Sequence, residues 1–132
     1  MDYVEKAPQA EDYLKLRKEA NMGGNKTITQ VEKALKGSLY IICVYEDSEL
    51  IGLGRVVGDG GITFAITDIM VSEKYQKKGI GNEIMNHIDR WFEENTAGEK
   101  FIMIHANPPA DRLYLKHGYD YIYPERVGML KK

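Results

Sequence analysis

A change of hydrophobic period in the middle of the chain constrains the fold most. Residues 62–71 are rich in β-branched and apolar residues, which is typical of a strand. In residues 82–95, apolar residues recur every three or four positions, which predicts an amphipathic helix. Residues 101–106 form a continuous apolar run, typical of a central strand buried on both faces. Because parallel strands need a long crossover, these three segments predict a βαβ unit.

The flanking segments complete a mixed α+β prediction. Residues 39–45, 50–57 and 62–71 are separated by short polar or glycine-rich turns, which predicts an antiparallel meander. Helices are predicted over residues 9–20, 29–36 and 110–117, the second opened by a capping box from Thr29 to Glu32. Residues 119–123 and 127–131 predict a closing hairpin. We therefore expect about six to seven strands and about four helices.

Length, charge and cysteine content exclude several classes of protein. A chain of 132 residues predicts one domain over residues 1–132. The formal net charge of −2 lacks the basic excess of a general nucleic-acid binder. The sequence has neither a membrane span nor a signal-peptide core. The single cysteine, Cys43, allows no disulfide within the chain and favours a reducing, cytoplasmic compartment. The histidines are scattered without the spacing of metal ligands, so no metal site is expected.

The segment between the strand at 62–71 and the following helix has the composition of an anion site. Gly79 and Gly81 remove the Cβ atoms that would keep a ligand away from the backbone. The first N–H groups of a helix have no intrahelical partner and suit a phosphate or pyrophosphate. Lys77 and Lys78 add positive charge beside them. The segment lacks the Gly-Lys-Ser/Thr of a nucleotide P-loop and the third glycine of a dinucleotide-binding fingerprint.

Two motifs resemble those of the GNAT acetyltransferases, the Gcn5-related N-acetyltransferases. Residues 76–81, Gln-Lys-Lys-Gly-Ile-Gly, match the family's Gln/Arg-x-x-Gly-x-Gly/Ala signature. Residues 113–119, Leu-Tyr-Leu-Lys-His-Gly-Tyr, resemble its Phe/Leu-Tyr-x-Lys-x-Gly-Phe/Tyr segment. One helix and one strand separate the two motifs, as in that fold.

The resemblance implies acetyl-coenzyme A as cofactor. The signature loop would hold the pyrophosphate, and the strand before it would pair with pantetheine through its backbone. Asn107, after the apolar strand, corresponds to a position that often contacts the cofactor. The implied cofactor-binding residues are Ile69, Met70, Val71, Gln76, Lys77, Lys78, Gly79, Ile80, Gly81, Asn82, Asn107 and Tyr114.

The resemblance also assigns catalytic roles. Tyr114 corresponds to the family's general acid, which protonates the coenzyme A thiolate as an amine attacks the thioester. Asp68 is the titratable residue in the stretch where the family often carries a base, and a water chain or binding of the free amine is an equal alternative. His105 is interpreted as a packed core histidine, and His87 as an exposed residue on the polar face of its helix.

The acceptor is predicted to be a primary amine of a small molecule. Arg55 and Arg17 suit the carboxylate of an amino-acid-like acceptor, whereas Tyr40, Tyr45 and Tyr123 suit an arylalkylamine. Residues 54–62 resemble a bacterial branch of small GNAT proteins that includes arylalkylamine-acetyltransferase-like members. The predicted substrate-binding residues are Arg55, Met22 and Tyr123.

The sequence also leaves open two other functions and the formation of a homodimer. The chain could acetylate a protein lysine or N-terminus, or it could be a catalytically silent acyl-CoA sensor. The open edge left by the final strand favours a homodimer. No nucleic acid and no membrane is expected as a partner.

Overall fold

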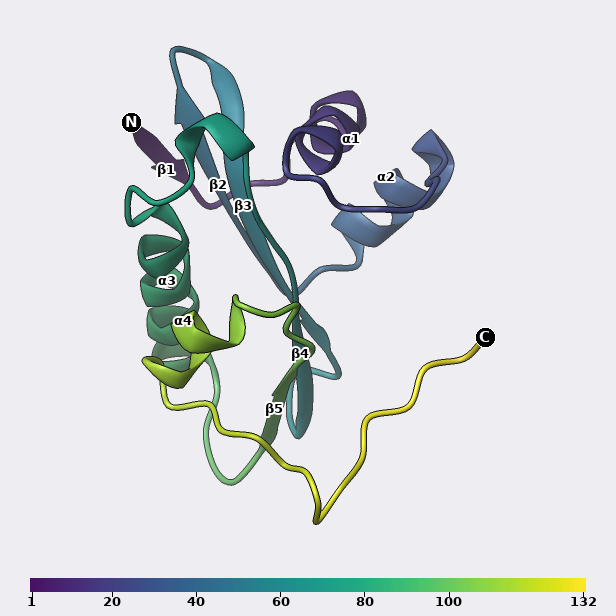
Figure 1. The fold of residues 1–132 in the computed structure, drawn as a ribbon, viewed down its shortest axis with the longest axis vertical. Helices are drawn as coiled ribbons and strands as arrows, with labels where there is room; N and C mark the ends of the chain where they lie inside the picture. The colour runs from purple at the N-terminus through teal and green to yellow at the C-terminus, as the bar shows by residue number, and fades with distance from the viewer.

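A five-stranded sheet in the order β1-β2-β3-β4-β5 organises residues 1–132, all of which the computed structural model describes (Figure 1). The strands are β1 (Asp2–Val4), β2 (Tyr40–Glu46), β3 (Glu49–Gly58), β4 (Thr63–Val71) and β5 (Phe101–Ile104). The first four pair antiparallel and β5 runs parallel to β4. The meander and the βαβ unit are therefore confirmed.

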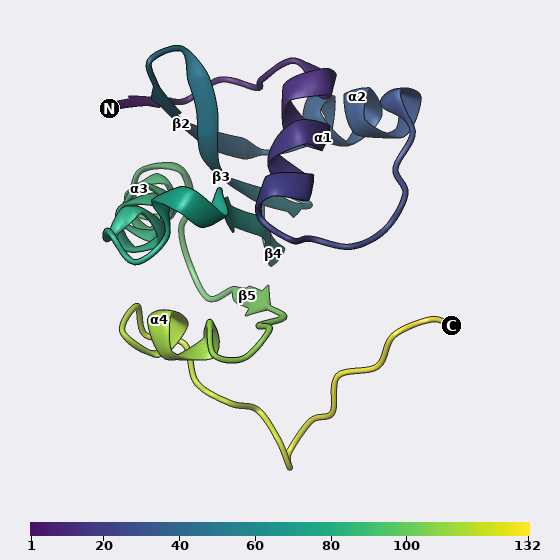
Figure 2. The same cartoon turned by 45° about the horizontal axis from the view of Figure 1, so that its top comes forward.

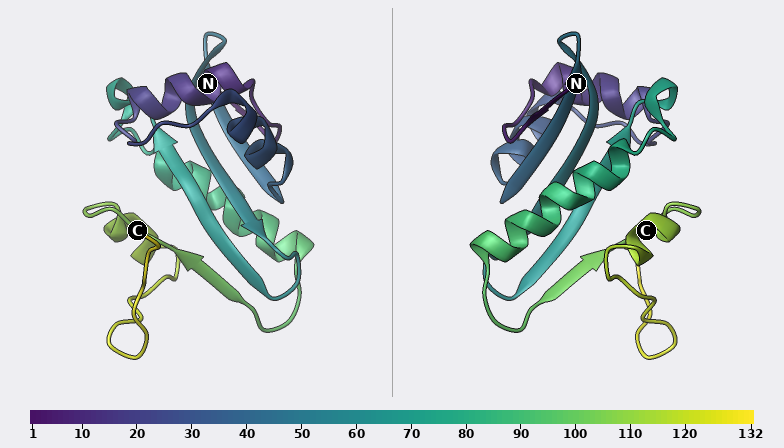
Figure 3. Two further views of the ribbon diagram at one scale, coloured as in Figure 1. Left: turned by 90° about the vertical axis from the view of Figure 1, so that its right-hand side faces the viewer. Right: turned by 90° about the vertical axis from the view of Figure 1, so that its left-hand side faces the viewer.

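Helices cover the two faces of the sheet. The helices α1 (Ala10–Glu19) and α2 (Ile28–Lys36) lie on one face, and α3 (Ile80–Asn95) lies on the other (Figures 2 and 3). The short η1 (Glu73–Tyr75) and α4 (Asp111–Leu115) follow β4 and β5. Each face has its own buried core: Leu16, Val31 and Leu53 belong to the first, and Phe64 and Ile84 to the second.

The start of α2 corrects the predicted capping box. The Oγ1 atom of Thr27 accepts from the Gln30 backbone N–H at 3.1 Å, and Gln30 Oε1 accepts from the Thr27 N–H at 3.1 Å. This reciprocal pair satisfies two N–H groups at the helix end, so the N-cap is Thr27, two residues earlier than predicted. Thr29 lies inside the helix.

The C-terminal third departs further from the prediction. Residues 119–132 form no strand, so the closing hairpin is wrong and the sheet has five strands (Figure 1). The strand β5 is at the sheet edge, and the interpretation of a central strand is also wrong. Phe101 and Met103 are 53% and 47% exposed because no helix covers their side of β5. A continuous apolar run does not distinguish a central strand from an uncovered edge.

A bulge in β4 opens the sheet. Arg55 pairs with Thr67 and Leu53 with Met70, so two steps along β3 match three steps along β4. The extra residue is accommodated at Asp68, whose φ of +55° is in the left-handed region. Parallel pairing with β5 covers only residues 63–66 of β4, and beyond the bulge the two strands diverge (Figure 3).

Candidate active site

A cavity of about 820 Å³ lies where β4 and β5 diverge. One wall is residues 65–69 of β4, and the other is the end of β5 with the segment that leads to α4. Asn21 and Met22, after α1, close one end, and Tyr114 of α4 lines the interior. The volume suits a ligand of drug size or larger. The cleft thus follows directly from the β4 bulge.

The loop between η1 and α3 presents free backbone donors at one end of this region. None of the N–H groups of residues 77–82 donates to a backbone or side-chain acceptor in the chain. Lys77 and Gly79 have positive φ values of 63° and 83°, so the chain curls around a concave site. Space around the Cα of Gly79 is open, since a Cβ built there meets nothing within 4 Å. Six free donors at the start of a 16-residue helix could bind an anion such as a phosphate group.

Side-chain contacts fix the position of this loop. The Gln76 amide donates to the Val71 carbonyl at 2.9 Å, which ties the loop to the end of β4. The Lys78 ammonium lies 5.5 Å from the centre of the Tyr75 ring. Lys78 thus adds a positive charge to the loop that carries the free N–H groups, and such a charge favours an anionic ligand.

Tyr114 lies in the cleft on α4, with its phenol free. Its side chain is buried, and its hydroxyl has no hydrogen-bond partner in the chain. Burial raises the pKa of the Tyr114 phenol, so it keeps its proton at neutral pH. A protonated phenol that faces a cleft can donate a proton to a ligand.

His117 links the end of α4 to α3 through two hydrogen bonds. The ring of His117, just after α4, has Nδ1 2.6 Å from Asp89 Oδ2 and Nε2 2.8 Å from Asn82 Oδ1. Asn82 belongs to the first turn of α3, beside the free N–H groups. These two contacts therefore fix Tyr114 relative to the free N–H groups of residues 77–82.

Asp68, at the bulge, is the centre of a polar cluster. Tyr13 donates to its Oδ2 at 2.5 Å, Arg17 to its Oδ1 at 3.1 Å, and Arg55 to its Oδ2 at 2.8 Å. Arg17 also donates to the Gly23 carbonyl at 2.7 Å. Burial, and then the Asp68 hydrogen bond, raises the pKa of Tyr13. One carboxylate thus joins α1, the loop after it and β3 to the bulge.

A second cavity, of about 430 Å³, lies between this cluster and α2. It shares Met22, Thr67 and Asp68 with the cleft, so the two cavities are neighbours. Its charged lining residues are Arg17, Lys26 and Arg55 against Asp68 alone, and Lys26 makes no ion pair. The cavity therefore carries an excess of two positive charges.

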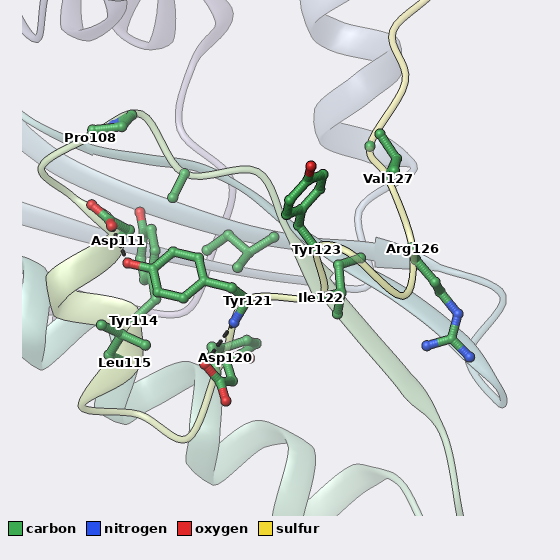
Figure 4. A pocket seen from close by; sticks show the side chains of 14 residues that line it. Pro108, Asp111, Tyr114, Leu115, Asp120, Tyr121, Ile122, Tyr123, Arg126 and Val127 are labelled. Atoms are coloured by element: carbon green, nitrogen blue, oxygen red, sulfur yellow. Dashed lines mark hydrogen bonds between the residues drawn. The ribbon is translucent and has the colours of Figure 1, made fainter.

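Some of the other predicted site residues line the cavities, and others lie outside them. Ile69 and Asn107 line the cleft, and Met22 lines both cavities. Met70 is buried in the core beneath α1, with its side chain away from the cleft. Tyr123 lies outside the cleft, in a third pocket of about 300 Å³ (Figure 4).

Two histidines correct the sequence interpretation. His105 is exposed and lines the cleft, so it is not a packed core residue. His87 is 16% exposed and stacks on the Tyr3 ring with centroids 5.1 Å apart, so it is not solvent-exposed. Both errors concern burial. Histidine has both apolar and polar atoms, so its burial is decided by neighbours from distant elements and not by the local sequence.

Sequence reasoning missed Tyr13 and Lys26. Tyr13 and Arg17 are four residues apart on α1 and face the same side of it, which is the available sequence signal. Lys26 gives no signal beyond its place in a glycine-containing loop.

The model of the acetyltransferase (GNAT) family matches residues 7–119. The chain belongs to this family. A probable acetyltransferase of unknown function from methicillin-resistant Staphylococcus aureus has a solved structure that is 37% identical and superposes with a TM-score of 0.93. The match covers 99% of this chain and 98% of that one. Family membership confirms the resemblance and, with it, acetyl-CoA as the cofactor of this fold family.

A curated sequence relative and a further solved structure are also similar to this chain. An uncharacterized ycf52-like N-acetyltransferase of Prochlorococcus marinus is 30% identical over 96 residues, which are 70% of this chain and 52% of that protein. The chain thus spans about half the length of this curated relative. A predicted acetyltransferase of Clostridium acetobutylicum, solved with acetyl-CoA, has a TM-score of 0.71 at 16% identity, covering 98% and 95% of the chains, and shares the fold.

No group of three or more metal-ligating side chains is close enough to hold a metal ion. None of the helices is long and apolar enough to span a membrane.

Proposed function

We propose that this GNAT protein transfers an acetyl group from acetyl-CoA to a primary amine of a small molecule. The observation that carries the proposal is the pairing of six free N–H groups with the buried, unbonded phenol of Tyr114 around one cleft. The donor set fits a pyrophosphate, because backbone N–H groups at a helix N-terminus suit phosphate oxygens. The cleft beside the bulge has room for an extended chain.

Each part of the site has a role in the proposal. The N–H groups of residues 77–82 would bind the pyrophosphate, with Gln76 holding the loop in place. The free edge of β4 around Ile69 would pair with the pantetheine amides, and Asn107 would contact the opposite side. Bound acetyl-CoA supplies the thioester. As the amine forms its C–N bond and the C–S bond breaks, Tyr114 would give its proton to the departing sulfur, and the proton lost by the amine would pass to water in the cleft.

Asp68 is better suited to positioning than to proton abstraction. Its Oδ2 accepts from Tyr13 and Arg55 and its Oδ1 accepts from Arg17, so three of its roughly four acceptor positions are already used within the protein. In the proposed site it holds α1 and β3 against the bulge and so keeps the cleft open. Water in the cleft beside the exposed His105 is the alternative route for the amine proton.

The charge of the second cavity supports an amino-acid-like acceptor over an arylalkylamine. Its excess of positive charge repels a simple alkylammonium and attracts an acceptor that also carries a carboxylate. Arg55 and Lys26 would bind that carboxylate and Met22 would contact the carbon chain, while the amine points through the shared boundary into the cleft. Tyr40 is buried in the core and Tyr123 lies outside both cavities, so neither forms an aromatic acceptor pocket.

A thiol-release assay tests the reaction. Wild-type protein, acetyl-CoA and a panel of amino acids, arylalkylamines and lysine peptides would be compared with the Tyr114→Phe variant. We expect release with amino acids and at least a tenfold lower kcat in the variant, with an unchanged Kd for coenzyme A by calorimetry. Thiol release with peptides alone would indicate protein acetylation instead. Binding of coenzyme A without any release would indicate a sensor and reject the proposal.

We also propose that the protein is a cytoplasmic homodimer. The buried free thiol of Cys43 supports a reducing compartment. The uncovered edge of β5 supports a homodimer, because an open apolar edge is a ready site for pairing with another chain.

A further inference from the structure

Three titratable side chains line the cleft, and two of them already have a task. They are Asp68, Tyr114 and His105. Asp68 accepts three hydrogen bonds within the protein, and a proton on it would weaken its ion pairs with Arg17 and Arg55. The buried phenol of Tyr114 keeps its proton at neutral pH and is the acid of the proposed reaction. His105 is therefore the titratable side chain of the cleft that has no defined role.

His105 follows β5 directly and points to the α1 side of the sheet. Ile104 and Ala106 pack against the core on the α3 side. Side chains alternate along an extended chain, so His105, between these two residues, faces the opposite way. No helix covers that side of β5, and the imidazole is exposed (Figure 2). Met103, which faces the same way as His105, lines the cleft with it.

The ring of His105 makes no hydrogen bond and no ion pair with the chain, unlike the two other histidines. His87 Nδ1 lies 2.9 Å from the Glu83 carbonyl oxygen, and the ring of His117 is held by two contacts to α3. Histidine is the side chain that ordinarily gains and loses a proton between pH 5 and 8. A free imidazole in the cleft can therefore exchange a proton with a ligand or with water.

The groups around His105 leave it available to a ligand. Asp68 faces the cleft from β4, paired with the two arginines of the polar cluster, and Tyr114 faces it from α4. The loop after α1 contributes uncharged residues. In the C-terminal part of the chain, Gly128 comes so close that a Cβ built on it would lie 3.8 Å from His105 Nε2, and the guanidinium of Arg126 lies over the ring of the first β5 residue. None of these groups forms an ion pair with the imidazole.

We propose that His105 is the base that removes a proton from the ammonium group of the acceptor. The inference rests on the proposed function, because it requires an amine acceptor in the cleft. At neutral pH most aliphatic amines are protonated, and an ammonium nitrogen has no lone pair with which to attack a thioester. His105 takes one of its protons, directly or through one water molecule, and becomes an imidazolium. The nitrogen thereby gains the lone pair that it needs.

The remaining proton transfers balance with Tyr114 as the acid. The neutral nitrogen attacks the carbonyl carbon, the C–N bond forms and the C–S bond breaks, and Tyr114 gives its proton to the sulfur, so coenzyme A leaves as a thiol. The second proton of the nitrogen passes through water in the cleft to the Tyr114 phenolate and restores the phenol. The imidazolium of His105 releases its proton to solvent from its exposed side. The products are the amide, the thiol and one proton.

The base and the acid approach the reacting atoms from opposite sides of the sheet. Tyr114 belongs to the core on the α3 side, the side of the loop that would hold the pyrophosphate. His105 faces the α1 side, where the second cavity is lined by residues of α1 and α2 and would hold the carboxylate of the acceptor. The base thus lies on the side of the acceptor and the acid on the side of the cofactor.

The pH profile of the His105→Gln variant tests the proposal. With an amino acid that the wild type acetylates, we expect the wild-type kcat/KM to rise through the neutral range and then level off. The variant should be about tenfold slower or more at pH 7, and its rate should keep rising with pH as free amine becomes available. Its Kd for coenzyme A and its unfolding midpoint should match those of the wild type, because the replaced side chain is exposed. His87→Gln, the same change on α3 outside the cleft, is the matched control and should keep the wild-type profile.

Added imidazole supplies a second readout, which a merely structural role would not move. It should restore part of the lost kcat in His105→Ala and none in Tyr114→Phe, because it can replace the base but not the acid. A His105→Gln profile parallel to that of an active wild type, or a His105→Ala variant that imidazole does not rescue, would overturn the role of His105 alone. A wild type that releases no thiol with any amine at any pH would overturn the proposed function and this role with it.

Discussion

Replacing Asp68 by Asn removes one charge from the centre of the Tyr13–Arg17–Arg55 cluster and little else. Asn fits the same space and tolerates a positive φ well, so the bulge at φ +55° is preserved. The side chains of Arg17, Arg55 and Asp68 are 13%, 12% and 8% exposed, so both guanidinium groups lose their carboxylate in a largely buried site. Removing one partner of a buried ion pair costs about 3 kcal/mol or more. We expect a loss of about 3 kcal/mol in the free energy of unfolding.

Urea denaturation followed by circular dichroism measures this loss. With a urea m-value of about 2 kcal/mol/M for a chain of this size, the midpoint should fall by about 1.5 M. Asp2→Asn is the matched control, because Asp2 is exposed on β1 and makes no ion pair, so it changes the net charge equally. Adding Arg17→Met to Asp68→Asn should restore part of the stability, since one unpaired guanidinium is removed. A midpoint equal to that of Asp2→Asn would refute the reasoning that Asp68 holds the site together.

Gly79, Asp59 and Cys43 each allow a test by changing or labelling one residue. Gly79→Ala should raise the Kd for coenzyme A at least tenfold by calorimetry, because φ +83° is unfavourable for alanine; an unchanged Kd would reject the anion site. Backbone N–H groups lower the pKa of Asp59, so its contribution to stability is present above about pH 4 and is lost as the pH falls further. The unfolding midpoint of Asp59→Asn should therefore depend less on pH below pH 4 than that of the wild type. Cys43 should resist thiol reagents at pH 8 until urea unfolds the chain, and rapid labelling of native protein would contradict its burial.

Local patterns predict most of the elements, because propensity and hydrophobic period act over short stretches. The strand–helix–strand order around α3 and the turn glycines follow from such patterns alone. The capping box was predicted at the wrong pair of residues, because both Thr27…Gln30 and Thr29…Glu32 fit the same sequence pattern. The true pair is decided by where the preceding loop ends, and the pattern does not contain that information.

Features that depend on distant neighbours were not predictable in this way. The two arginines of the polar cluster lie 51 and 13 residues from Asp68, and their meeting depends on the bulge. The closing hairpin failed for a related reason, since residues 119–132 have strand-like composition but no neighbour within one chain. The two family motifs, by contrast, indicated the loop with the free N–H groups and the tyrosine that lines the cleft, because each motif is a short local stretch of sequence.

The short parallel pairing of β5 also has a consequence for the order of folding. Four residue pairs join β5 to β4, and the two members of each pair are 38 positions apart in the sequence, so this contact forms at a high cost in loop-closure entropy. The antiparallel meander of β1–β4 can form before it, with α3 packed on β2 and β3. We therefore expect β5 and α4 to form a separate cooperative unit, whose amides exchange with deuterium before those of the meander. The wall of the cleft that carries Tyr114 would then be the last part of the protein to fold and the first to open.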